Sequence, residues 1–464
     1  MNIMEEKYKR KIYTLEGLSP EIRAVTFATC SRSPESFADI AKELTEEKSS
    51  EFHEKWVVGY GHSSVAEHAV LSLAIENVSF LATKVIEDNR LASYTEKSSR
   101  YQIFDRDKYY KPKKLMDSPL GKLYEETANF LFDTYTDLTA KVMDYVKNRI
   151  PKTAEMTDKM YETACKAKAC DIVRYILPTA ALTNLGMTVN ARNLEHAIAK
   201  LLSHPLEEMQ DIGRELKEAA KKSTPTLIKY ADANSYLVET EKSLGALAKD
   251  VVNGEIKEKE NEAKLVAYDQ DALDRVVTPL LYKYSKISYD EIREKVTAMS
   301  QEDKEKILNE ALKRMGQFDR PLREFEHTYY TFDILMDYGA FRDIQRHRIC
   351  TQTNQEITPD YGYAVHEDIV AAGFEEKYRE CMRRARETYE KIVSEFPKEA
   401  QYILPLAYRK RVLITWNLRE LFHFIPLRSS KRGHISYRRI AGQVWDEVNR
   451  VHPYFAKHIK VDKT

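Results

Sequence analysis

The sequence predicts an α+β protein built from two tandem copies of one unit. The 464-residue chain has 14 glycines and 15 prolines, roughly half their usual share, which is typical of a helix-rich protein. Long segments repeat apolar residues at helical spacing, whereas only short segments alternate as strands do. Similar blocks of sequence recur in both halves of the chain. We therefore expect each copy to contain a small antiparallel or mixed sheet and several long helices.

Composition argues against several classes of protein. Lys+Arg and Asp+Glu balance at 73 each, so net charge indicates neither a nucleic-acid-binding nor a membrane-surface protein. The five cysteines are scattered, odd in number and form no C-x-x-C pair, so we expect neither a disulfide framework nor a metal site. The N-terminal segment is charged from residue 5 and no stretch approaches the length of an apolar membrane span, which predicts a cytoplasmic protein.

Three blocks recur in the same order in the two halves. The first is Glu-His, a strand pattern and a helix pattern ending in an arginine, which is Arg90 in one half and Arg348 in the other. The second is Tyr-Ile-Leu-Pro, and the third is Asn-x-Arg, whose arginines are Arg192 and Arg419. Three blocks in one order indicate a duplication.

A charged segment marks the boundary between the copies. Residues 238–264 are rich in charge and poor in large apolar residues, which is typical of a connector or of a solvated helix. We therefore place copy one at residues 1–237, a charged connector at 238–264 and copy two at 265–464.

Each copy is expected to run strand, helix, polar loop and long helices. In copy one, Ser64–Glu67 has the capping-box form of a helix start, and Val70–Ile75 alternates like a strand. In copy two, Asp319–Pro321 is the matching helix start and Phe332–Met336 the matching strand. Helical spacing of apolar residues predicts long helices over residues 116–150, 193–222, 294–316 and 374–396.

Two cationic groups in copy two are candidates for anion recognition. Arg346–Arg348 places two guanidiniums around His347, and guanidinium is a planar donor suited to phosphate and carbonyl groups. Arg419 and His423 share one helix face, and Arg428 follows. Each pattern alone also suits a solvated helix end or face. Their occurrence within one duplicated unit favours a binding site.

These residues resemble the signature of the flavin-dependent thymidylate synthases, the ThyX family, which is RHRxxSxNxxSxR followed by tyrosine. The resemblance covers residues 20–225 and 265–455, as two ThyX-like copies. Copy one keeps the end of the signature, Ser98-Ser99-Arg100-Tyr101, but has Asp88-Asn89 in place of Arg-His. Copy two keeps Arg-His-Arg at 346–348 but has Thr358 in place of the loop arginine.

The losses in the two copies are complementary. Before the Asn-x-Arg block, copy one has Arg174 where copy two has Gln401; after it, copy two has Arg428 where copy one has Leu201. In the family, each dUMP pocket takes these elements from different subunits of a homotetramer. The resemblance therefore implies one complete composite dUMP pocket, formed by Ser98, Ser99, Arg100 and Arg174 of copy one with Arg346 and Arg428 of copy two. The reciprocal pocket would hold Asp88, Leu201, Thr358 and Gln401 and should repel a phosphate.

The resemblance also implies the chemistry, which is reductive methylation of dUMP to dTMP. Methylenetetrahydrofolate would supply the carbon, FAD the hydride and NADPH the reducing equivalents, so no protein nucleophile is assigned. The implied FAD-binding residues are His62, Glu67, Arg90, Asn190, Arg192, Glu326, Arg346, His347, Arg348, Asn417, Arg419 and His423. His62, Glu67 and Glu326 suit helix capping or buried hydrogen bonding equally well. A dimer of chains, a pseudo-tetramer, would replace the family homotetramer.

Other interpretations stay open at this point. Thr351 and Asn354 depart from the signature, so the site could act on another pyrimidine nucleotide or use another one-carbon donor. The protein could also be a catalytically silent flavin- or nucleotide-binding paralogue. Nucleic-acid binding through 431–434 and 438–439 is disfavoured by the balanced charge. Whether the composite pocket forms within one chain or between chains, and whether the reciprocal pocket binds FAD, is also open.

Overall fold

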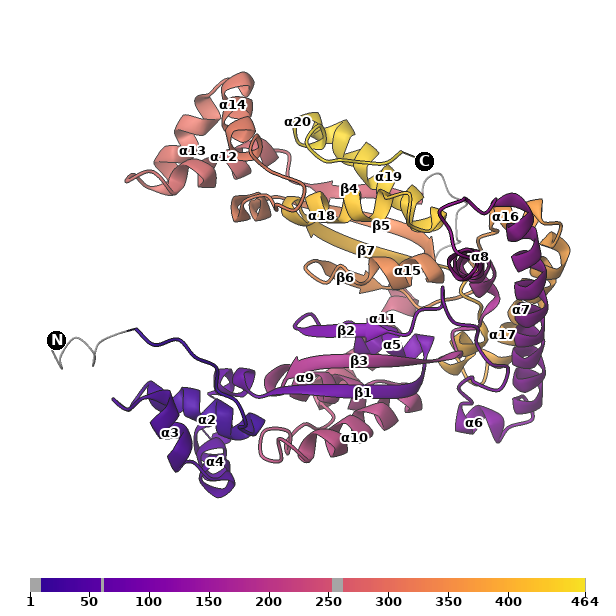
Figure 1. Ribbon diagram of the computed structural model, residues 1–464, viewed down its shortest axis with the longest axis horizontal. Helices are drawn as coiled ribbons and strands as arrows, with labels where there is room; N and C mark the ends of the chain where they lie inside the picture. Colours follow the sequence, from indigo (N-terminus) through magenta and orange to yellow (C-terminus); the bar gives the residue numbers. More distant parts are fainter. Residues whose placement is uncertain (1–9, 60–61, 253–261, 464) are drawn as a thin grey trace. The chain divides into compact units, whose positions relative to one another are not determined.

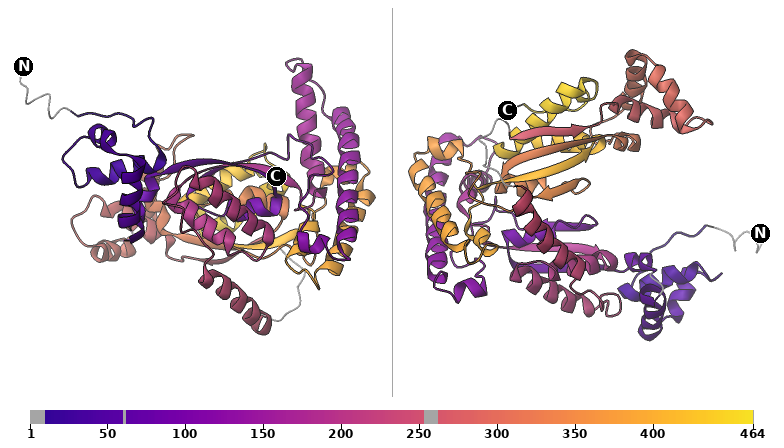
Figure 2. Two further views of the ribbon diagram at one scale, coloured as in Figure 1. Left: turned by 90° about the horizontal axis from the view of Figure 1, so that it is seen from below. Right: turned by 180° about the vertical axis from the view of Figure 1, so that it is seen from behind.

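The chain forms two compact units, which do not follow the two halves of the sequence. The computed structural model describes residues 10–59, 62–252 and 262–463. Unit 1 comprises residues 1–76, 91–96 and 184–253, and unit 2 comprises 77–90, 97–183 and 254–464. Unit 2 therefore combines segments of copy one with copy two (Figures 1 and 2).

Unit 1 is organised around a small sheet with the strand order β1-β3-β2. Its strands are β1 (Val70–Ser79), β2 (Ala92–Glu96) and β3 (Leu182–Asn190); residues 77–79 of β1 and 182–183 of β3 are assigned to unit 2. β2 pairs antiparallel with β3, with Ala92 opposite Val189. The helices of this unit in the described residues are α2 (Pro20–Cys30), α3 (Phe37–Glu43), α4 (Glu46–Phe52), η1 (His53–Gly59), η2 (Ser63–His68), α9 (Ala191–Leu202), α10 (Glu207–Lys221) and α11 (Ser235–Val251).

Unit 2 contains a sheet with the order β4-β5-β7-β6, in which each pairing is antiparallel. Its strands are β4 (Ala263–Tyr268), β5 (Tyr329–Asp337), β6 (Thr351–Asn354) and β7 (Arg409–Asn417). β5 is apolar and buried along most of its length, which places it in the core. Trp416 of β7 packs against Phe424 of α18 (Leu418–Ser429) at a ring distance of 4.6 Å, so α18 covers one face of the sheet.

The remaining described helices belong to unit 2. They are α5 (Phe80–Ile86), α6 (Lys113–Met116), α7 (Gly121–Arg149), α8 (Asp158–Val173), η3 (Arg174–Ile176), α12 (Ala272–Tyr282), α13 (Tyr289–Ala298), α14 (Gln301–Leu312), η4 (Arg323–His327), α15 (Tyr338–Ile344), α16 (Glu367–Ala371), α17 (Glu375–Ile392), η5 (Glu399–Ile403), α18 (Leu418–Ser429), α19 (Ile435–Val451) and α20 (Pro453–Ala456). None of these or the unit 1 helices, within the described ranges, is long and apolar enough to cross a membrane.

Corresponding residues of the two copies make the same contacts. The Tyr124 hydroxyl of α7 donates to the Tyr110 carbonyl at 2.8 Å, and the Tyr378 hydroxyl of α17 donates to the Ala364 carbonyl at 2.8 Å. In unit 1, Arg192 pairs with Glu67; in unit 2, Arg419 Nη1 pairs with Glu326 Oε1 at 2.9 Å. These matched contacts support the predicted duplication.

The two Tyr-Ile-Leu-Pro segments join the copies inside unit 2. Thr179 N donates to Leu404 O at 2.9 Å, and Leu406 N donates to Leu177 O at 2.9 Å. Each segment donates a backbone hydrogen bond to the other, so the two segments pair antiparallel in a two-fold symmetric way. Because each segment directly follows a short helix and precedes a strand, this pairing brings elements of copy one beside elements of copy two.

The predicted α+β class is confirmed, but several local expectations are wrong. The helices expected over 193–222 and 294–316 are each interrupted, at 203–206 and 299–300, and the helix start expected at Asp319–Pro321 lies at Arg323. The start at Ser64–Glu67 is a short 3-10 helix, Ser63–His68, whose N-cap is His62 and which has no side-chain cap. β7 was not expected as a strand because it begins with three cationic residues, 409–411, which hide its alternation. In the connector, residues 238–251 belong to α11, residues 263–264 belong to β4, and residues 253–261 lie outside the described part of the chain.

Candidate anion-binding site

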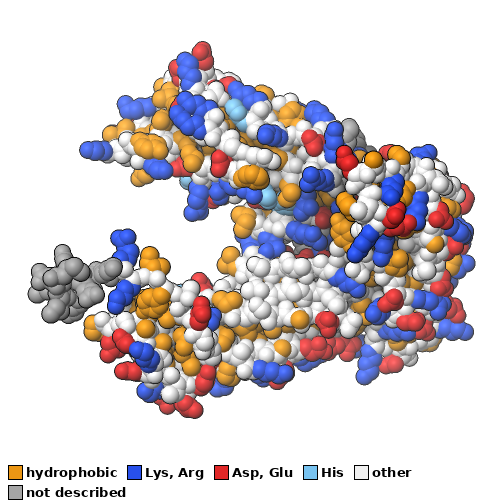
Figure 3. Space-filling view, in the orientation of Figure 1, with side chains coloured by type: hydrophobic (Ala, Val, Ile, Leu, Met, Phe, Trp, Pro, Cys, Tyr) orange, Lys and Arg blue, Asp and Glu red, His pale blue; other side chains and the backbone are white. Residues whose placement is uncertain are grey.

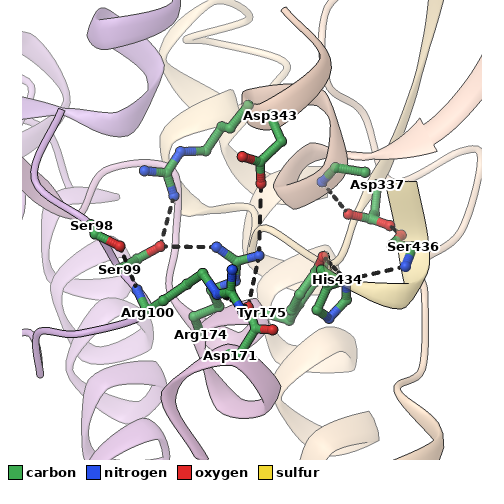
Figure 4. A network of polar contacts seen from close by, with 12 residues as sticks. Ser98, Ser99, Arg100, Asp171, Arg174, Tyr175, Asp337, Asp343, His434 and Ser436 are labelled. Carbon is green, nitrogen blue, oxygen red and sulfur yellow. Dashed lines mark hydrogen bonds and ion pairs between the residues drawn. The ribbon is translucent and has the colours of Figure 1, made fainter. Parts of the chain in front are cut away.

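A buried serine of copy one is bound by one arginine from each copy. Ser99 lies in the polar loop after β2 and is 2% exposed. Its Oγ accepts hydrogen bonds from Arg174 Nη1 at 3.3 Å and from Arg342 Nη1 at 3.4 Å (Figure 4). Ser98 Oγ accepts the backbone N–H of Arg100 at 3.3 Å, which holds the loop in a tight turn. The loop of copy one and α15 of copy two therefore meet at Ser99.

Asp343 lies among arginines of both copies. Its carboxylate oxygens are 4.0 Å from Arg174 Nη2, 3.7 Å from Arg346 Nη1 and 3.6 Å from Arg428 Nη1. Burial opposes ionisation of Asp343, but the surrounding guanidiniums outweigh it, so the pKa of the carboxyl is lowered. Asp343 is therefore an ionised carboxylate at neutral pH, with 16% of its side chain exposed.

A second carboxylate, Asp171, connects the two arginines of copy one. Asp171 Oδ1 is 3.2 Å from Arg100 Nε and 3.1 Å from Arg174 Nη2. Arg174 is 5% exposed, and its Nε has no hydrogen-bond acceptor among the described residues. Asp171 thus positions Arg100 and Arg174 without satisfying all of their donors.

We call Arg100, Arg174, Arg342, Arg346 and Arg428 the arginine cluster. Two carboxylates, Asp171 and Asp343, lie against four of these arginines, so the guanidiniums outnumber these two carboxylates. Lys and Arg side chains also gather on the visible surface of unit 2 near α15 (Figure 3). Arg174, Arg342 and Arg428 are largely buried, and burying cationic side chains is costly unless anions compensate their charge. The cluster therefore suits an anionic ligand, and a phosphate matches the guanidinium geometry best.

His347 holds the late arginine in place in one defined tautomer. Arg428 Nε donates to His347 Nε2 at 2.9 Å, and His347 Nδ1 lies 2.9 Å from Glu420 Oε1. Because Nε2 accepts, the ring proton is on Nδ1 and is donated to Glu420. Burial, aided by the charge of Arg428, lowers the pKa of His347 to about 3. Burial also raises the pKa of Glu420 to about 6.

The low pKa of His347 predicts a loss of stability in mild acid. In the unfolded chain His347 takes up a proton near pH 6.5, whereas in the folded chain its pKa is about 3 and the ring stays neutral. The share of His347 in the unfolding free energy should therefore fall by about 2 kcal/mol between pH 7 and pH 5. Glu420, with its raised pKa, acts in the opposite direction below about pH 6 and offsets part of this fall.

Denaturant unfolding at pH 7 and pH 5 measures this share. His347→Gln should show a smaller pH difference than the wild type, while His196→Gln, at an exposed position, should match the wild type. Equal pH differences for all three proteins would contradict the assignment of a neutral buried His347.

The side chains of Tyr175 and His434 are in polar contact with each other beside the arginine cluster. The Tyr175 hydroxyl lies 3.0 Å from His434 Nδ1, which also accepts the backbone N–H of Ser436 at 3.2 Å (Figure 4). Burial and the nearby charge of Arg174 hold the pKa of His434 well below its ordinary value. His434 is 4% exposed. It therefore cannot contribute to an exposed basic surface in the segment 431–434, which the sequence offered as a candidate for nucleic-acid contact.

The expected flavin-binding residues divide between the two units. His62, Glu67, Asn190 and Arg192 lie in unit 1, and the other eight lie in unit 2. Asn190 and Asn417 are the N-caps of α9 and α18, accepting backbone N–H groups at 2.9 and 2.8 Å. These two amides serve as local helix caps in the described structure.

The flavin candidates of unit 2 lie along α18 and after α15. Arg419 Nε donates to Pro321 O at 2.8 Å, in addition to its ion pair with Glu326. His423 Nδ1 contacts Arg320, and its ring lies 5.3 Å from that of His347. Arg348 Nε donates to the carbonyl of Arg90 at 3.5 Å, and Arg90 Nη2 donates to Thr351 Oγ1 at 3.4 Å. Partly exposed guanidiniums and the partly exposed imidazole of His423 thus lie next to the arginine cluster.

The reciprocal region is built from the counterparts of the cluster. Lys84 forms a buried ion pair with Glu87, and Glu356 pairs with Lys398. Burial lowers the pKa of Lys410 to about 7, and Asp88 and Glu356 partly oppose this. In the reciprocal region, carboxylates therefore lie beside the lysines and offset their positive charge. Gln401 Nε2 donates to Lys398 O at 3.1 Å, and Leu201 is 1% exposed in the core of unit 1.

All six residues expected to bind dUMP lie in unit 2 of a single chain. The contacts join Ser98–Arg100 and Arg174 of copy one to the α15 segment and Arg428 of copy two through Ser99 and Asp343. The sequence reasoning missed Arg342, Asp343 and Asp171. A usable signal was present for Asp343, which lies one helical turn before Arg346 and so on the same face.

Comparison with known proteins agrees with this internal symmetry. A family model described as "Thymidylate synthase complementing protein" matches residues 17–226 and again 264–454. A UPF0159 protein of Chlamydia pneumoniae is 33% identical over 483 residues, covering 97% of this chain and 91% of that protein. A UPF0159 protein of Thermoplasma acidophilum is 29% identical and covers 90% of both chains.

Shorter relatives match about half of the chain. A flavin-dependent thymidylate synthase of Clostridium tetani is 27% identical over 214 residues, covering 46% of this chain and 82% of that protein. A solved flavin-dependent thymidylate synthase of Helicobacter pylori, in complex with FAD and dUMP, is 20% identical with a TM-score of 0.32 and covers 43% of this chain and 99% of that chain.

Proposed function

Because the chain belongs to the thymidylate synthase complementing protein family and carries two tandem copies of its unit, we propose that it is a flavin-dependent thymidylate synthase. It would methylate dUMP reductively to dTMP with methylenetetrahydrofolate as carbon donor and NADPH as reductant, in the cytoplasm. The named activity of its half-length relatives supports this reaction.

The observation that carries the proposal is the arginine cluster around Ser99. Arg100 and Arg174 come from copy one, and Arg342, Arg346 and Arg428 come from copy two, so neither copy alone has the full set. A nucleoside monophosphate carries a charge of about −2 on its phosphate at neutral pH. Such a dianion would place negative charge among these guanidiniums and accept a hydrogen bond from Arg174 Nε, a buried donor that has no acceptor among the described residues.

The chain's own residues would bind and orient the nucleotide. Ser99 Oγ holds Arg174 and Arg342 together, so their guanidiniums can act on one phosphate. His347 Nε2 accepts a hydrogen bond from Arg428 Nε, and the other N–H groups of Arg428 can donate to the ligand. Charge-assisted hydrogen bonds of this kind fix the position of the reacting base at no cost in reorganisation.

The residues next to the cluster fit a flavin dinucleotide, whose pyrophosphate requires cationic donors. Arg346, Arg348 and Arg419 with His423 are the residues of unit 2 that would hold it. When bound, FAD would supply the hydride chemistry that amino-acid side chains lack. His347 stays neutral beside it, since its pKa is about 3.

The proposal assigns one nucleotide site to each chain. In the reciprocal region, Asp88 corresponds to Arg346 of the cluster, and Glu356 corresponds to Ser98 of the copy-one loop. These carboxylates, together with Glu87, repel a phosphate and compensate the local lysines. We infer that the reciprocal region maintains the fold rather than binding a second nucleotide.

Three measurements test the proposed function. The purified protein should absorb in the visible flavin band and bind dUMP in calorimetry, and its gene should restore growth of a thymidine auxotroph. A catalytically silent paralogue would bind flavin and dUMP but fail to complement. A protein that binds neither flavin nor a pyrimidine nucleotide would contradict the proposed function.

We further propose that two chains associate, so that four copies replace a homotetramer of the family. Light scattering should then give twice the chain mass of 54.0 kDa. The outcome is independent of nucleotide binding, because the arginine cluster lies within unit 2 of one chain. A monomeric mass at micromolar concentration would contradict this assembly and leave the nucleotide site intact.

A further inference from the structure

We propose that Tyr175 is a positioning residue of the composite site: its side chain, which comes from copy one, holds Arg174 in place beside Arg428 of copy two. This inference rests on the proposed function, because it concerns how the two copies bind one phosphate. Tyr175 directly follows Arg174 in the chain and is 2% exposed. It therefore acts on the ligand through Arg174 rather than by contact.

The Tyr175 side chain extends from copy one to the first turn of α19 in copy two. Its hydroxyl lies 3.0 Å from His434 Nδ1, and the two rings stack with their centres 4.8 Å apart (Figure 4). His434 is the N-cap of α19, where Nδ1 accepts the backbone N–H of Ser436 at 3.2 Å. Because an N–H group already points at Nδ1, this nitrogen carries no proton and the Tyr175 hydroxyl is the donor. The hydroxyl is therefore held in one orientation.

A glycine in the first turn of α15 leaves room for the Tyr175 ring. A Cβ at Gly339 would lie 2.7 Å from Tyr175 Cε1 and 2.9 Å from the hydroxyl oxygen, so any side chain there must displace the ring. Asp337 caps the same helix by accepting the backbone N–H of Ala340 at 2.6 Å, and it also accepts a hydrogen bond from Ser436 Oγ. The starts of α15 and α19 are thus joined to each other and to Tyr175. We call the contacts of Tyr175 with Gly339 and His434 the tyrosine anchor.

The tyrosine anchor links the two arginines that approach Asp343 from different copies. Arg174 and Arg428 lie 4.0 and 3.6 Å from its carboxylate, beyond hydrogen-bond length, so Asp343 by itself does not fix either side chain. The hydrogen bond between Tyr175 and His434 joins the residue after Arg174 to the segment that follows Arg428. Because two guanidiniums repel each other, this neutral bond helps to keep both directed at one phosphate.

The counterpart tyrosine in copy two packs differently. Tyr402 corresponds to Tyr175, but Leu81 of copy one stands at the position that corresponds to Gly339. Leu81 is 8% exposed, so its side chain occupies interior space of the kind that Gly339 leaves open. The Tyr402 ring instead packs against Tyr110, with the ring centres 4.9 Å apart. Among the described residues, the tyrosine anchor therefore accompanies the arginine cluster and not the reciprocal region.

Tyr175→Phe removes the hydroxyl and keeps the ring. In calorimetric titration of the full-length protein, this variant should bind dUMP about 5-fold more weakly than the wild type, which is the effect of one neutral hydrogen bond. Deoxyuridine, which has no phosphate, should bind equally to both proteins. In an Arg174→Ala background, Tyr175→Phe should cause no further loss of dUMP affinity, because Tyr175 acts through Arg174. A general structural defect would instead weaken dUMP by the same factor in both backgrounds.

A second variant tests the same contact from the other copy. Gly339→Ala leaves the Tyr175 hydroxyl intact but displaces the ring, so it should weaken dUMP at least as much as Tyr175→Phe does. The matched control is Tyr402→Phe, which removes the counterpart hydroxyl and should leave dUMP affinity within a factor of about two. Circular dichroism and denaturant unfolding show whether each variant is folded before it is titrated.

Three results would overturn the inference while the proposed function stands: wild-type dUMP affinity in folded Tyr175→Phe and Gly339→Ala proteins, an equal loss of dUMP affinity with and without Arg174, or an equal loss for deoxyuridine. Inorganic phosphate is the second probe. If the folded wild type binds phosphate but not dUMP, and Tyr175→Phe weakens phosphate only when Arg174 is present, the inference stands and the proposed function fails. If the folded wild type binds neither ligand, both are wrong.

Discussion

Arg174→Ala should weaken dUMP binding about 10- to 100-fold, as severely as Arg428→Ala does, although the two arginines come from different copies. Each substitution removes a charge-assisted contact to a dianionic phosphate, and such contacts contribute roughly 1.5–3 kcal/mol. Both side chains belong to the cluster around Asp343, at 4.0 and 3.6 Å. Isothermal titration of dUMP into each variant measures the effect, and Arg100→Ala and Arg346→Ala should fall in the same range.

The reciprocal region provides matched controls. Gln401 is the copy-two counterpart of Arg174, and Thr358 is the counterpart of Arg100. Gln401→Ala and Thr358→Ala should leave dUMP affinity within a factor of about two, because neither side chain belongs to the arginine cluster. Unchanged binding in Arg100→Ala and Arg174→Ala would refute the composite site, and copy two would then act alone or bind another ligand.

A mixture of Arg100→Ala chains with Arg428→Ala chains should regain no thymidylate synthase activity. Arg100 is tied through Asp171 to Arg174, and Arg174 and Arg428 face the same Asp343 within one chain. Every chain in the mixture therefore lacks one member of its own cluster, however the chains associate. The assay is turnover after the two variants have been unfolded and refolded together, so that any dimers are mixed.

The control for this experiment is wild-type chain refolded with either variant, which should show activity in proportion to the wild-type fraction. Recovery of activity in the variant mixture would show that the site joins copy one of one chain to copy two of another. The arrangement within one chain would then be contradicted, while the requirement for both copies would remain.

Much of this protein could be predicted from local sequence patterns. The long helices α7 and α17 follow the 3.6-residue repeat, because one apolar stripe must face the core. β5 follows from an apolar run of the right length. The duplication follows from repeated blocks, since corresponding residues such as Arg192 and Arg419 must make corresponding contacts.

Other elements escaped local patterns because distant contacts decide them. Lys410, in β7, is buried against the ring of Phe341 at 4.1 Å, a contact that no spacing rule predicts. The expected capping box at Ser64 failed because the six-residue turn there leads directly into β1. Arg342 was missed because it looks like any helix residue until Ser99, far away in sequence, lies beside it.

The sequence by itself determined the fold class, the tandem copies and the complementary loss of arginines, because each of these is written in residue type and spacing. Only the tertiary structure decided that Ser99, Arg174, Arg342 and Arg428 meet within unit 2 of a single chain and that Asp343 lies among the arginines. The physical reason is the antiparallel pairing of 175–180 with 402–407, which exchanges backbone hydrogen bonds between the copies. Burial then strengthens the electrostatic attraction between these arginines and an anion, and burial exists only in the folded chain.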